Sequence, residues 1–197
     1  VQAVDVSYDS AQGCCIVAFV LTSNTNQYYR AFTTTGSNFA FSQANQIGTS
    51  IQTNSAVAAI NYDANAQKHL AVFRDSASNN YGYLVPISVS GTTVTIGTAS
   101  TGISTALENG VRRVAVYYDT TAQKSTVVQL NSSSTKIYPV DLTGSSPTVG
   151  TTITSQGATV GSYTAAVFVP TQNRAVLAQR NTNGTVYANL YQNDYVD

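Results

Sequence analysis

Short apolar runs separated by polar turns recur along the whole chain, and the second quarter of the sequence shows the pattern most clearly. Residues 57–62 form a short alternating run, and residues 70–73 form another after the turn Asp-Ala-Asn-Ala-Gln-Lys. Residues 81–89 alternate again, and residues 92–96 are rich in β-branched side chains. This spacing predicts four short strands joined by turns. No segment keeps an apolar period near 3.6 residues beyond two turns, so we predict almost no helix.

The same pattern occurs four times. Residues 57–75 and 113–131 both contain a Tyr-Asp pair, then Ala-Gln-Lys, then an apolar run. Residues 4–21 keep the Tyr-Asp pair, and their turn reads as one residue shorter. Residues 163–181 keep the apolar runs, with Val-Pro in the place of Tyr-Asp. Four copies at near-constant spacing indicate a tandem repeat.

The Tyr-Asp positions fix the period of the repeat. Tyr8, Tyr62 and Tyr118 are separated by 54 and 56 residues, and the equivalent Val169 follows about 51 residues later. We therefore expect a single repeat array over residues 1–197. Its repeats are expected at residues 1–55, 56–110, 111–160 and 161–197, the last one incomplete.

Four antiparallel strands in a unit of this length are typical of the blade of a β-propeller. Each blade is a small sheet that buries both faces only by packing against neighbouring blades. This packing accounts for the apolar residues on both faces of the first two strands. A large β-sandwich, or tandem sandwiches that each pair two repeats, is the alternative all-β architecture. Recurrent turn chemistry at equivalent positions favours the propeller.

Composition narrows the class of protein. Of 197 residues, 9% are charged, acidic and basic side chains balance, and Ser, Thr, Asn and Gln together number 77. The 13 tyrosines and many valines are atypical of disordered chains. Nine basic residues are too few for electrostatic binding of nucleic acid. No run approaches the roughly 20 apolar residues of a membrane-spanning helix, so we expect neither nucleic acid nor membrane as a partner.

The two cysteines are adjacent, at Cys14 and Cys15. Neighbouring side chains on a strand point to opposite faces, so a disulfide between these two is geometrically poor. A redox or metal pair needs wider spacing and further ligands. We expect one cysteine in the core and one outside it, with an intermolecular bridge as the alternative.

Candidate catalytic groups are few. His69 is the only histidine, and it falls where the first copy has Cys14, so we interpret it as a strand residue. Asp9, Asp63 and Asp119 occupy equivalent turn positions, where a carboxylate can accept hydrogen bonds from backbone amides. The chain has one glutamate, and no loop concentrates acidic residues. We therefore predict no catalytic residue, no metal site and no cofactor, and a protein that is not an enzyme.

Tyrosines recur where the third strand of each repeat begins, after loops rich in amides and hydroxyls. The candidates for glycan contact are Tyr28, Tyr29, Tyr81, Tyr83, Tyr138 and Tyr187. Tyrosine rings can stack on sugar C–H faces while neighbouring amides meet sugar hydroxyls. The alternative, which we favour, is that these rings pack between blades with their hydroxyls at the rim. Two N-glycosylation triplets, at Asn131 and Asn183, lie in predicted hairpin loops.

The last repeat has no room for a fourth strand, so its third strand is expected at an open edge. An unpaired edge presents free N–H and C=O groups and recruits other strands. We predict that another subunit, or further parent chain, covers this assembly edge. The edge residues are Val186, Tyr187, Ala188, Asn189, Leu190 and Tyr191. The chain has no methionine, and we expect it to be a processed product or part of something longer.

Two segments resemble a known group of repeats, and they read NYDANAQKHLAVFRD (residues 61–75) and YGYLVPISVSGTTVTIG (residues 81–97). They resemble tandem repeats of tail-fibre and other virion surface proteins of bacteriophages, especially marine and cyanobacterial ones. In that family a Tyr-Asp turn, a Tyr-Gly strand start and a Val-Ser-Gly-Thr hairpin ending in Ile-Gly or Phe-Gly recur. The third copy matches partly, through Tyr118-Asp119 and Ala122-Gln123-Lys124.

The other two copies match this family less well. The first keeps Tyr8-Asp9 without a Tyr-Gly, and the fourth keeps little beyond its strand pattern. The resemblance implies membership of a virion or extracellular appendage. It carries over no binding residue.

Three functions are compatible with these features of the sequence. The first is a non-enzymatic structural or adhesive module of a virion surface or extracellular fibre, whose partners are copies of itself or other fibre parts. The second is a lectin-like module that binds receptors or cell-surface glycans. The third, a glycosidase-type enzyme, predicts two carboxylates within about 10 Å of one another across a cleft.

Overall fold

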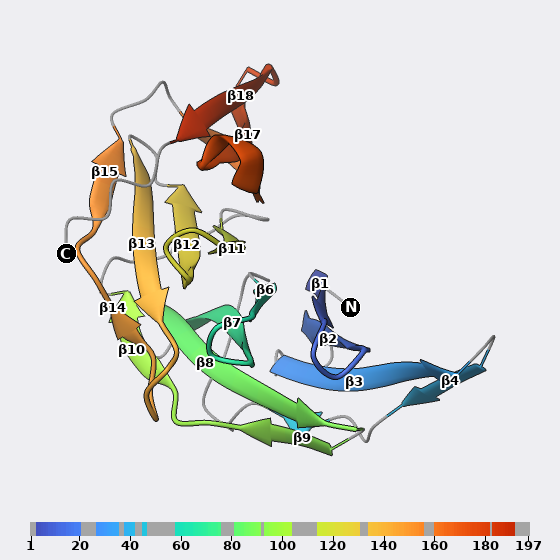
Figure 1. Ribbon diagram of the computed structural model, residues 1–197. Coiled ribbons are helices and arrows are strands. Elements are labelled where there is room, and N and C mark those ends of the chain that lie inside the picture. The colour runs from blue at the N-terminus through green and yellow to red at the C-terminus, as the bar shows by residue number, and fades with distance from the viewer. Residues whose placement is uncertain are drawn as a thin grey trace.

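The computed structural model of this chain is all-β (Figure 1). It describes residues 3–20, 27–35, 38–41, 45–46, 58–75, 81–91, 93–103, 114–130, 134–155, 160–181 and 183–191. In these ranges the only helix is the short 3-10 turn η1 (Pro170–Gln172), as the lack of a helical period predicts. No helix of the described part has the length and apolar character needed to cross a membrane.

The strands form four antiparallel sheets, which we call blades 1 to 4. Blade 1 comprises β1 (Ala3–Asp9), β2 (Cys14–Val20), β3 (Gln27–Thr35), β4 (Asn38–Phe41) and β5 (Asn45–Gln46). Blade 2 comprises β6 (Ala58–Asp63), β7 (Lys68–Asp75), β8 (Tyr81–Ser90), β9 (Thr93–Ile96) and β10 (Ser100–Ile103). Blade 3 comprises β11 (Val114–Asp119), β12 (Lys124–Leu130), β13 (Thr135–Asp141), β14 (Thr148–Val149) and β15 (Ile153–Ser155). Blade 4 comprises β16 (Val160–Val169), β17 (Arg174–Asn181) and β18 (Val186–Tyr191).

The blades follow one another around a common centre as in a β-propeller. Their first strands lie innermost, with β1 against β6, β6 against β11 and β11 against β16. A separate hydrophobic core fills each of the three joints between successive blades. Phe73, Leu70 and Leu177 are fully buried members of the first, second and third core, respectively. The structure thus confirms the propeller arrangement over the β-sandwich.

The turn between the first two strands has the same length in all four blades. The strand pairs that close it are Asp9 with Cys14, Asp63 with Lys68, Asp119 with Lys124, and Val169 with Arg174. The residue before each closing position has a left-handed backbone, with φ of 63° at Gly13, 52° at Gln67, 54° at Gln123 and 50° at Asn173. A shared left-handed residue explains why these turns superpose despite their different sequences.

This common length corrects three expectations from the sequence. The turn of the first copy is not shorter than the others, so His69 corresponds to Cys15 and not to Cys14. In the fourth copy, Phe168 and Val169 occupy the places of Tyr and Asp, one residue earlier than Val-Pro. The repeats are hard to align at this turn from sequence alone, because Gly13 stands at the left-handed position where blades 2 and 3 have Gln67 and Gln123.

The outer strand of blades 2 and 3 is broken in two at a proline–glycine contact. The N–H of Gly97 donates to the Pro86 carbonyl at 2.8 Å, and that of Gly150 donates to the Pro139 carbonyl at 2.9 Å. A Cβ added at Gly97 would lie 2.8 Å from the Pro86 ring, so only glycine fits without a shift. The Ile-Gly that ends the predicted fourth strand is therefore a bend between β9 and β10.

Candidate functional site

The turn aspartates Asp9, Asp63 and Asp119 are polar groups at the joints between blades. Oδ1 of Asp63 accepts hydrogen bonds from the N–H groups of Asn65 and Ala66, at 3.1 and 2.9 Å. Asp9 and Asp119 make the corresponding pairs of bonds in their own turns. These bonds confirm turn capping as the role of the three carboxylates. All three residues are buried, with at most 2% of the residue exposed.

The second carboxylate oxygen of Asp9 and that of Asp63 are directed toward the next blade. The Ser125 hydroxyl, on β12 of blade 3, donates to Oδ2 of Asp63 at 2.9 Å. Nearby, the Lys68 ammonium donates to the carbonyls of Leu142 and Gly144, both at 2.9 Å. One aspartate therefore both closes its own turn and joins its blade to the next one.

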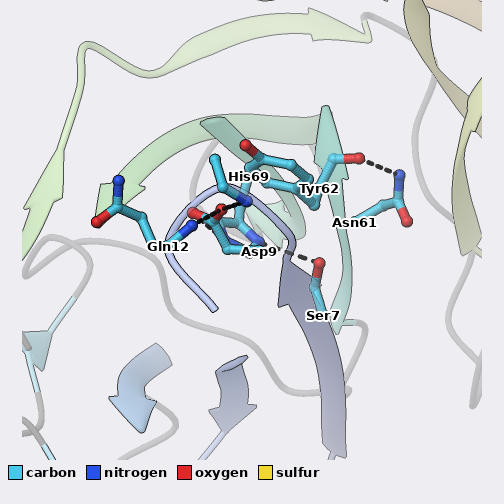
Figure 2. Close-up of polar contacts among 7 residues, drawn as sticks. Ser7, Asp9, Gln12, Asn61, Tyr62 and His69 are labelled. Carbon is cyan, nitrogen blue, oxygen red and sulfur yellow. Dashed lines mark hydrogen bonds and ion pairs between the residues drawn. The ribbon is translucent and has the colours of Figure 1, made fainter. Parts of the chain in front are cut away.

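At the joint between blades 1 and 2, the residue that corresponds to Ser125 is His69 (Figure 2). His69 is fully buried and lies between Ser7 and Asp9. Its Nδ1 is 3.0 Å from Ser7 Oγ, and its Nε2 is 3.7 Å from Asp9 Oδ2. The second distance is too long for a hydrogen bond, so Nε2 has no hydrogen-bond partner.

Tyr62 completes this cluster, with its ring centroid 5.1 Å from that of His69. Burial, together with the charge of Asp9 and a hydrogen bond to it, raises the pKa of Tyr62 to about 12. Tyr118 repeats the arrangement in blade 3, where burial and Asp63 raise its pKa. In the recurrent Tyr-Asp pair, the aspartate thus caps its own turn while the tyrosine reaches the turn of the preceding blade.

Burial determines the charge state of His69. It lowers the pKa of this imidazole to about 4, against the opposing effect of Asp9. The ring is therefore neutral near pH 7. In the tautomer that carries its proton on Nε2, that N–H faces Asp9 while the Ser7 hydroxyl donates to Nδ1.

Ser7, His69 and Asp9 are the residue types of a nucleophilic triad, but all three are buried. A Ser–His–Asp triad needs a serine oxygen that substrate can reach. Ser7 is 6% exposed, and it does not line the central channel, although its neighbours on β1 do. The arrangement can hold two blades together, and it offers no surface on which a substrate could react.

A central channel runs between the blades. It has a volume of about 300 Å³ and is lined by all four innermost strands. Its polar side chains are Asp5, Asn61 and Thr164, and the rest are valine, alanine and isoleucine. Asp5 accepts a hydrogen bond from the N–H of Ile60 at 2.9 Å, across the joint of blades 1 and 2. Thr164 Oγ1 is buried without a hydrogen-bond partner.

This lining limits the chemistry available in the channel. Asp5 is the only carboxylate among its lining residues. Nowhere in the described ranges do three or more His, Cys, Asp or Glu side chains group as metal ligands would. A glycosidase would need a second carboxylate facing the first, and the channel walls do not supply it.

The predicted glycan-contact tyrosines whose side chains the structure describes do not share one surface. Tyr138 is 3% exposed, and its hydroxyl donates to Gln129 at 2.8 Å within blade 3. Tyr83 is half-buried against the core between blades 1 and 2, whereas Tyr187 is 42% exposed on β18. The side chains of Tyr28, Tyr29 and Tyr81 lie outside the described residues, although their backbone belongs to β3 and β8.

The remaining sequence predictions fall in three places. Cys14 is buried in the first core, Cys15 is half-buried, and both are free thiols, which confirms their expected alternation. Burial, with a contribution from Asp9, raises the pKa of the Cys14 thiol. Asn183 lies on the exposed hairpin before β18, where its Oδ1 accepts bonds from the N–H and hydroxyl of Thr185. Asn131 lies outside the described residues.

The predicted assembly edge is the outer strand of blade 4 in the described structure. β18 pairs with β17 along its whole length, and no described strand lies on its other side. Val186 and Leu190 are 68% and 56% exposed. What covers this edge in an assembly stays a prediction.

Sequence reasoning missed Ser7, Ser125 and Thr164. A signal for Ser125 was present, because it stands six residues after the turn aspartate, as His69 and Cys15 do. The misaligned first turn concealed this column. Thr164 lies on an apolar strand and carries no sequence signal of its own.

A comparison with a solved structure supports the fold. A solved structure of a protein from Lactobacillus plantarum aligns with a TM-score of 0.54 at 13% identity, over 97% of this chain and 57% of that chain. TolB from Acinetobacter baumannii aligns with a TM-score of 0.49 at 12% identity, over 99% of this chain and 42% of that one. This chain therefore spans less than two thirds of either protein. No family model matches it, and no curated protein does.

Proposed function

We propose that this chain is a non-enzymatic structural or adhesive module of a virion surface or an extracellular fibre. Low charge, many hydroxyl and amide side chains and a rigid array of antiparallel blades suit exposure to the medium. Its partners are copies of itself or other parts of the same assembly. The resemblance of residues 61–97 to phage virion repeats supports the location.

One observation carries the proposal: the reactive polar groups are used inside the blade joints. Asp9, Asp63 and His69 are 2%, 1% and 0% exposed, and each faces the neighbouring blade. Buried polar groups that are bonded across an interface fix its geometry. The side chains with catalytic chemistry therefore serve to hold the array in one shape.

The location can be tested by immunogold electron microscopy with antibody raised against the purified chain. Intact particles and cells of the organism that encodes the chain would be labelled, with a deletion strain as the control. We expect gold on virions or surface fibres. Gold confined to the cell interior would overturn the proposal.

A lectin-like function is the second candidate, because Tyr187 is exposed on β18. An exposed tyrosine ring offers a stacking face for a sugar. On a glycan array, this function predicts reproducible binding that Tyr187→Ala removes and Thr95→Ala, on exposed β9, leaves intact. An array without any bound glycan would sink this candidate and leave the structural one standing.

A further inference from the structure

Among the described residues, the large hydrophobic side chains that stay exposed all lie on the two terminal blades. They are Val4, Val6 and Tyr8 on blade 1, and Val167, Val186, Tyr187 and Leu190 on blade 4. Their exposed fractions run from 42% to 68%. The described side chains of blades 2 and 3 include none of this kind. Apart from Tyr187, whose strand partner Gln179 bonds to Thr135 of blade 3, these side chains lie on the outer faces of the two blades. Uncovered apolar faces of this kind mark interaction sites.

The uncovered face of blade 1 is the face that a preceding blade covers elsewhere in the chain. Val6 and Tyr8 correspond to Ile60 and Tyr62 of blade 2. Ile60 and Tyr62 are 4% and 9% exposed, whereas Val6 and Tyr8 are 56% and 59% exposed. Blade 1 is therefore built to receive a blade in front of it.

The uncovered face of blade 4 is the face that a following blade covers elsewhere. Val167, Val176 and Leu190 stand side by side across its three strands. Val167 and Val176 correspond to Tyr117 and Thr126 of blade 3, which are 3% and 0% exposed. Val167 and Leu190 are 57% and 56% exposed instead. Blade 4 is built to be followed by another blade.

Figure 1 shows the blade of β1 and the blade of β17 and β18 at the two ends of the series. Each of β1, β6 and β11 packs on the next innermost strand, but no contact of similar extent joins β16 to β1 in the described structure. The two faces are thus complementary halves of a joint that this chain forms three times but leaves open at its ends.

We propose that a second copy of this chain covers the open faces, with blade 1 of one copy packed on blade 4 of the other. This inference rests on the proposed function, because a structural module is joined to its neighbours in an assembly. It identifies that neighbour as a second copy of the chain. Such a head-to-tail contact builds a closed ring or a filament, depending on the rotation between copies.

The side chains at the two ends match for this purpose. Within the chain, Asp63 at the end of one innermost strand faces Ser125 in the next blade. At the contact between copies, the corresponding residues are Val169 and Cys15. Neither carries a charge, so closing the joint buries no unpaired carboxylate. The two ends have lost the polar pair together, as two surfaces that meet would.

The first experiment compares the association of variants by sedimentation over a wide range of protein concentration. Val6→Asp damages the face of blade 1, Leu190→Asp damages that of blade 4, and Thr95→Asp on exposed β9 is the control. We expect the chain to associate, and each face variant to associate roughly tenfold or more weakly, because a buried unpaired carboxylate is costly. Thr95→Asp should match the unchanged chain. An equimolar mixture of the two face variants should regain one joint.

Restored association in the mixture separates a head-to-tail contact from a symmetric one, in which one of the two variants alone would still pair. A chain that stays monomeric at every concentration would overturn the proposal, as would a face variant that associates normally. Circular dichroism of each variant reports whether it has folded.

A second experiment leaves both faces intact. In the joint of blades 1 and 2, the corresponding residues Asp9 and His69 approach one another only through the tips of their side chains, 3.7 Å apart. Two cysteines at these positions are too far apart for a direct disulfide, but within the span of a short bifunctional maleimide. Val169→Cys should therefore be cross-linked to Cys15 of another copy by bismaleimidoethane, seen as a dimer on a denaturing gel. Adding Cys15→Ser should abolish that dimer. A cross-link within one chain, or none at all, would overturn the proposal. Because both experiments use purified protein, they are independent of where the protein is located.

Discussion

The joint between blades 1 and 2 and the joint between blades 2 and 3 share one backbone design and differ at one side-chain position. In both, a turn aspartate caps its own turn and a tyrosine of the next blade reaches that turn. At the position facing the carboxylate, one joint has His69 and the other has Ser125. The serine donates at 2.9 Å, whereas Nε2 of the histidine stays unpaired at 3.7 Å.

The difference shows that the joint is defined by its backbone and by the aspartate. Both joints close with a well-packed core, whichever side chain faces the carboxylate. The third joint, between blades 3 and 4, extends the comparison, because Ala175 occupies this position there. In that joint the rings of Tyr117 and Phe168 are stacked, with their centroids 6.3 Å apart. The residue at this position therefore affects how the stability of the joint depends on pH, but the joint forms with any of the three residues.

The largest expected effect comes from removing the shared element. Asp63→Ala leaves two turn N–H groups and the buried Ser125 hydroxyl without their acceptor, and should destabilise the chain by about 3 kcal/mol. The matched control is Asp141→Ala, because Asp141 caps an exposed turn by accepting two hydrogen bonds from Thr143, while Lys68 of blade 2 acts on it through charge alone. The control should cost about 1 kcal/mol or less. Urea unfolding measures both, and equal losses would contradict a special role for Asp63.

The second effect tests what the histidine adds. In the folded chain the pKa of His69 is about 4, below its ordinary value of 6.5. The unfolded chain therefore takes up the proton first as pH falls, so stability is complete above about pH 6.5 and declines from there toward pH 4. Between pH 7.5 and 5 the loss should be about 2 kcal/mol. Urea midpoints across this range measure it.

His69→Ser gives the matched control, since it copies the joint of blades 2 and 3. The variant should keep its stability nearly constant over the same pH range, where most carboxylates are still ionised. An unchanged pH dependence in the variant would show that another group carries the effect.

The repeat made the architecture predictable, because each blade buries its two faces in the same way and therefore keeps the same apolar columns. The turn aspartates were predictable as caps for the same reason. The pairing of His69 with Ser7 and Asp9 was not, because it joins residues 62 and 60 positions apart across two sheets. The left-handed residue at Gly13 also escaped notice, since no common side chain marks that backbone conformation.

A smaller effect separates the two tyrosines. Tyr62→Phe removes the hydroxyl that is hydrogen-bonded to Asp9, which has no serine donor from blade 2 to replace it. We expect a loss of about 1.5 kcal/mol. Tyr118→Phe should cost about 0.5 to 1 kcal/mol, because Asp63 keeps its bond from Ser125. Thermal unfolding of both variants measures the difference, and a larger loss for Tyr118→Phe would show that Ser125 does not compensate.

The smallest effect tests whether the two turns are equivalent in backbone as well as in length. Gly13 and Gln67 occupy the same left-handed position, with φ of 63° and 52°. A side chain is strained there, so Gln67→Gly should stabilise the chain by up to about 1 kcal/mol, less the entropy that glycine adds to the unfolded state. Gly13→Gln is the reciprocal change, and a Cβ at Gly13 would meet nothing within 4 Å. It should therefore fold normally and lose a similar amount through backbone strain alone. If the two variants shift the urea midpoint in opposite directions, the two turns have equivalent backbones. Shifts of the same sign would show that the turns differ in more than their side chains.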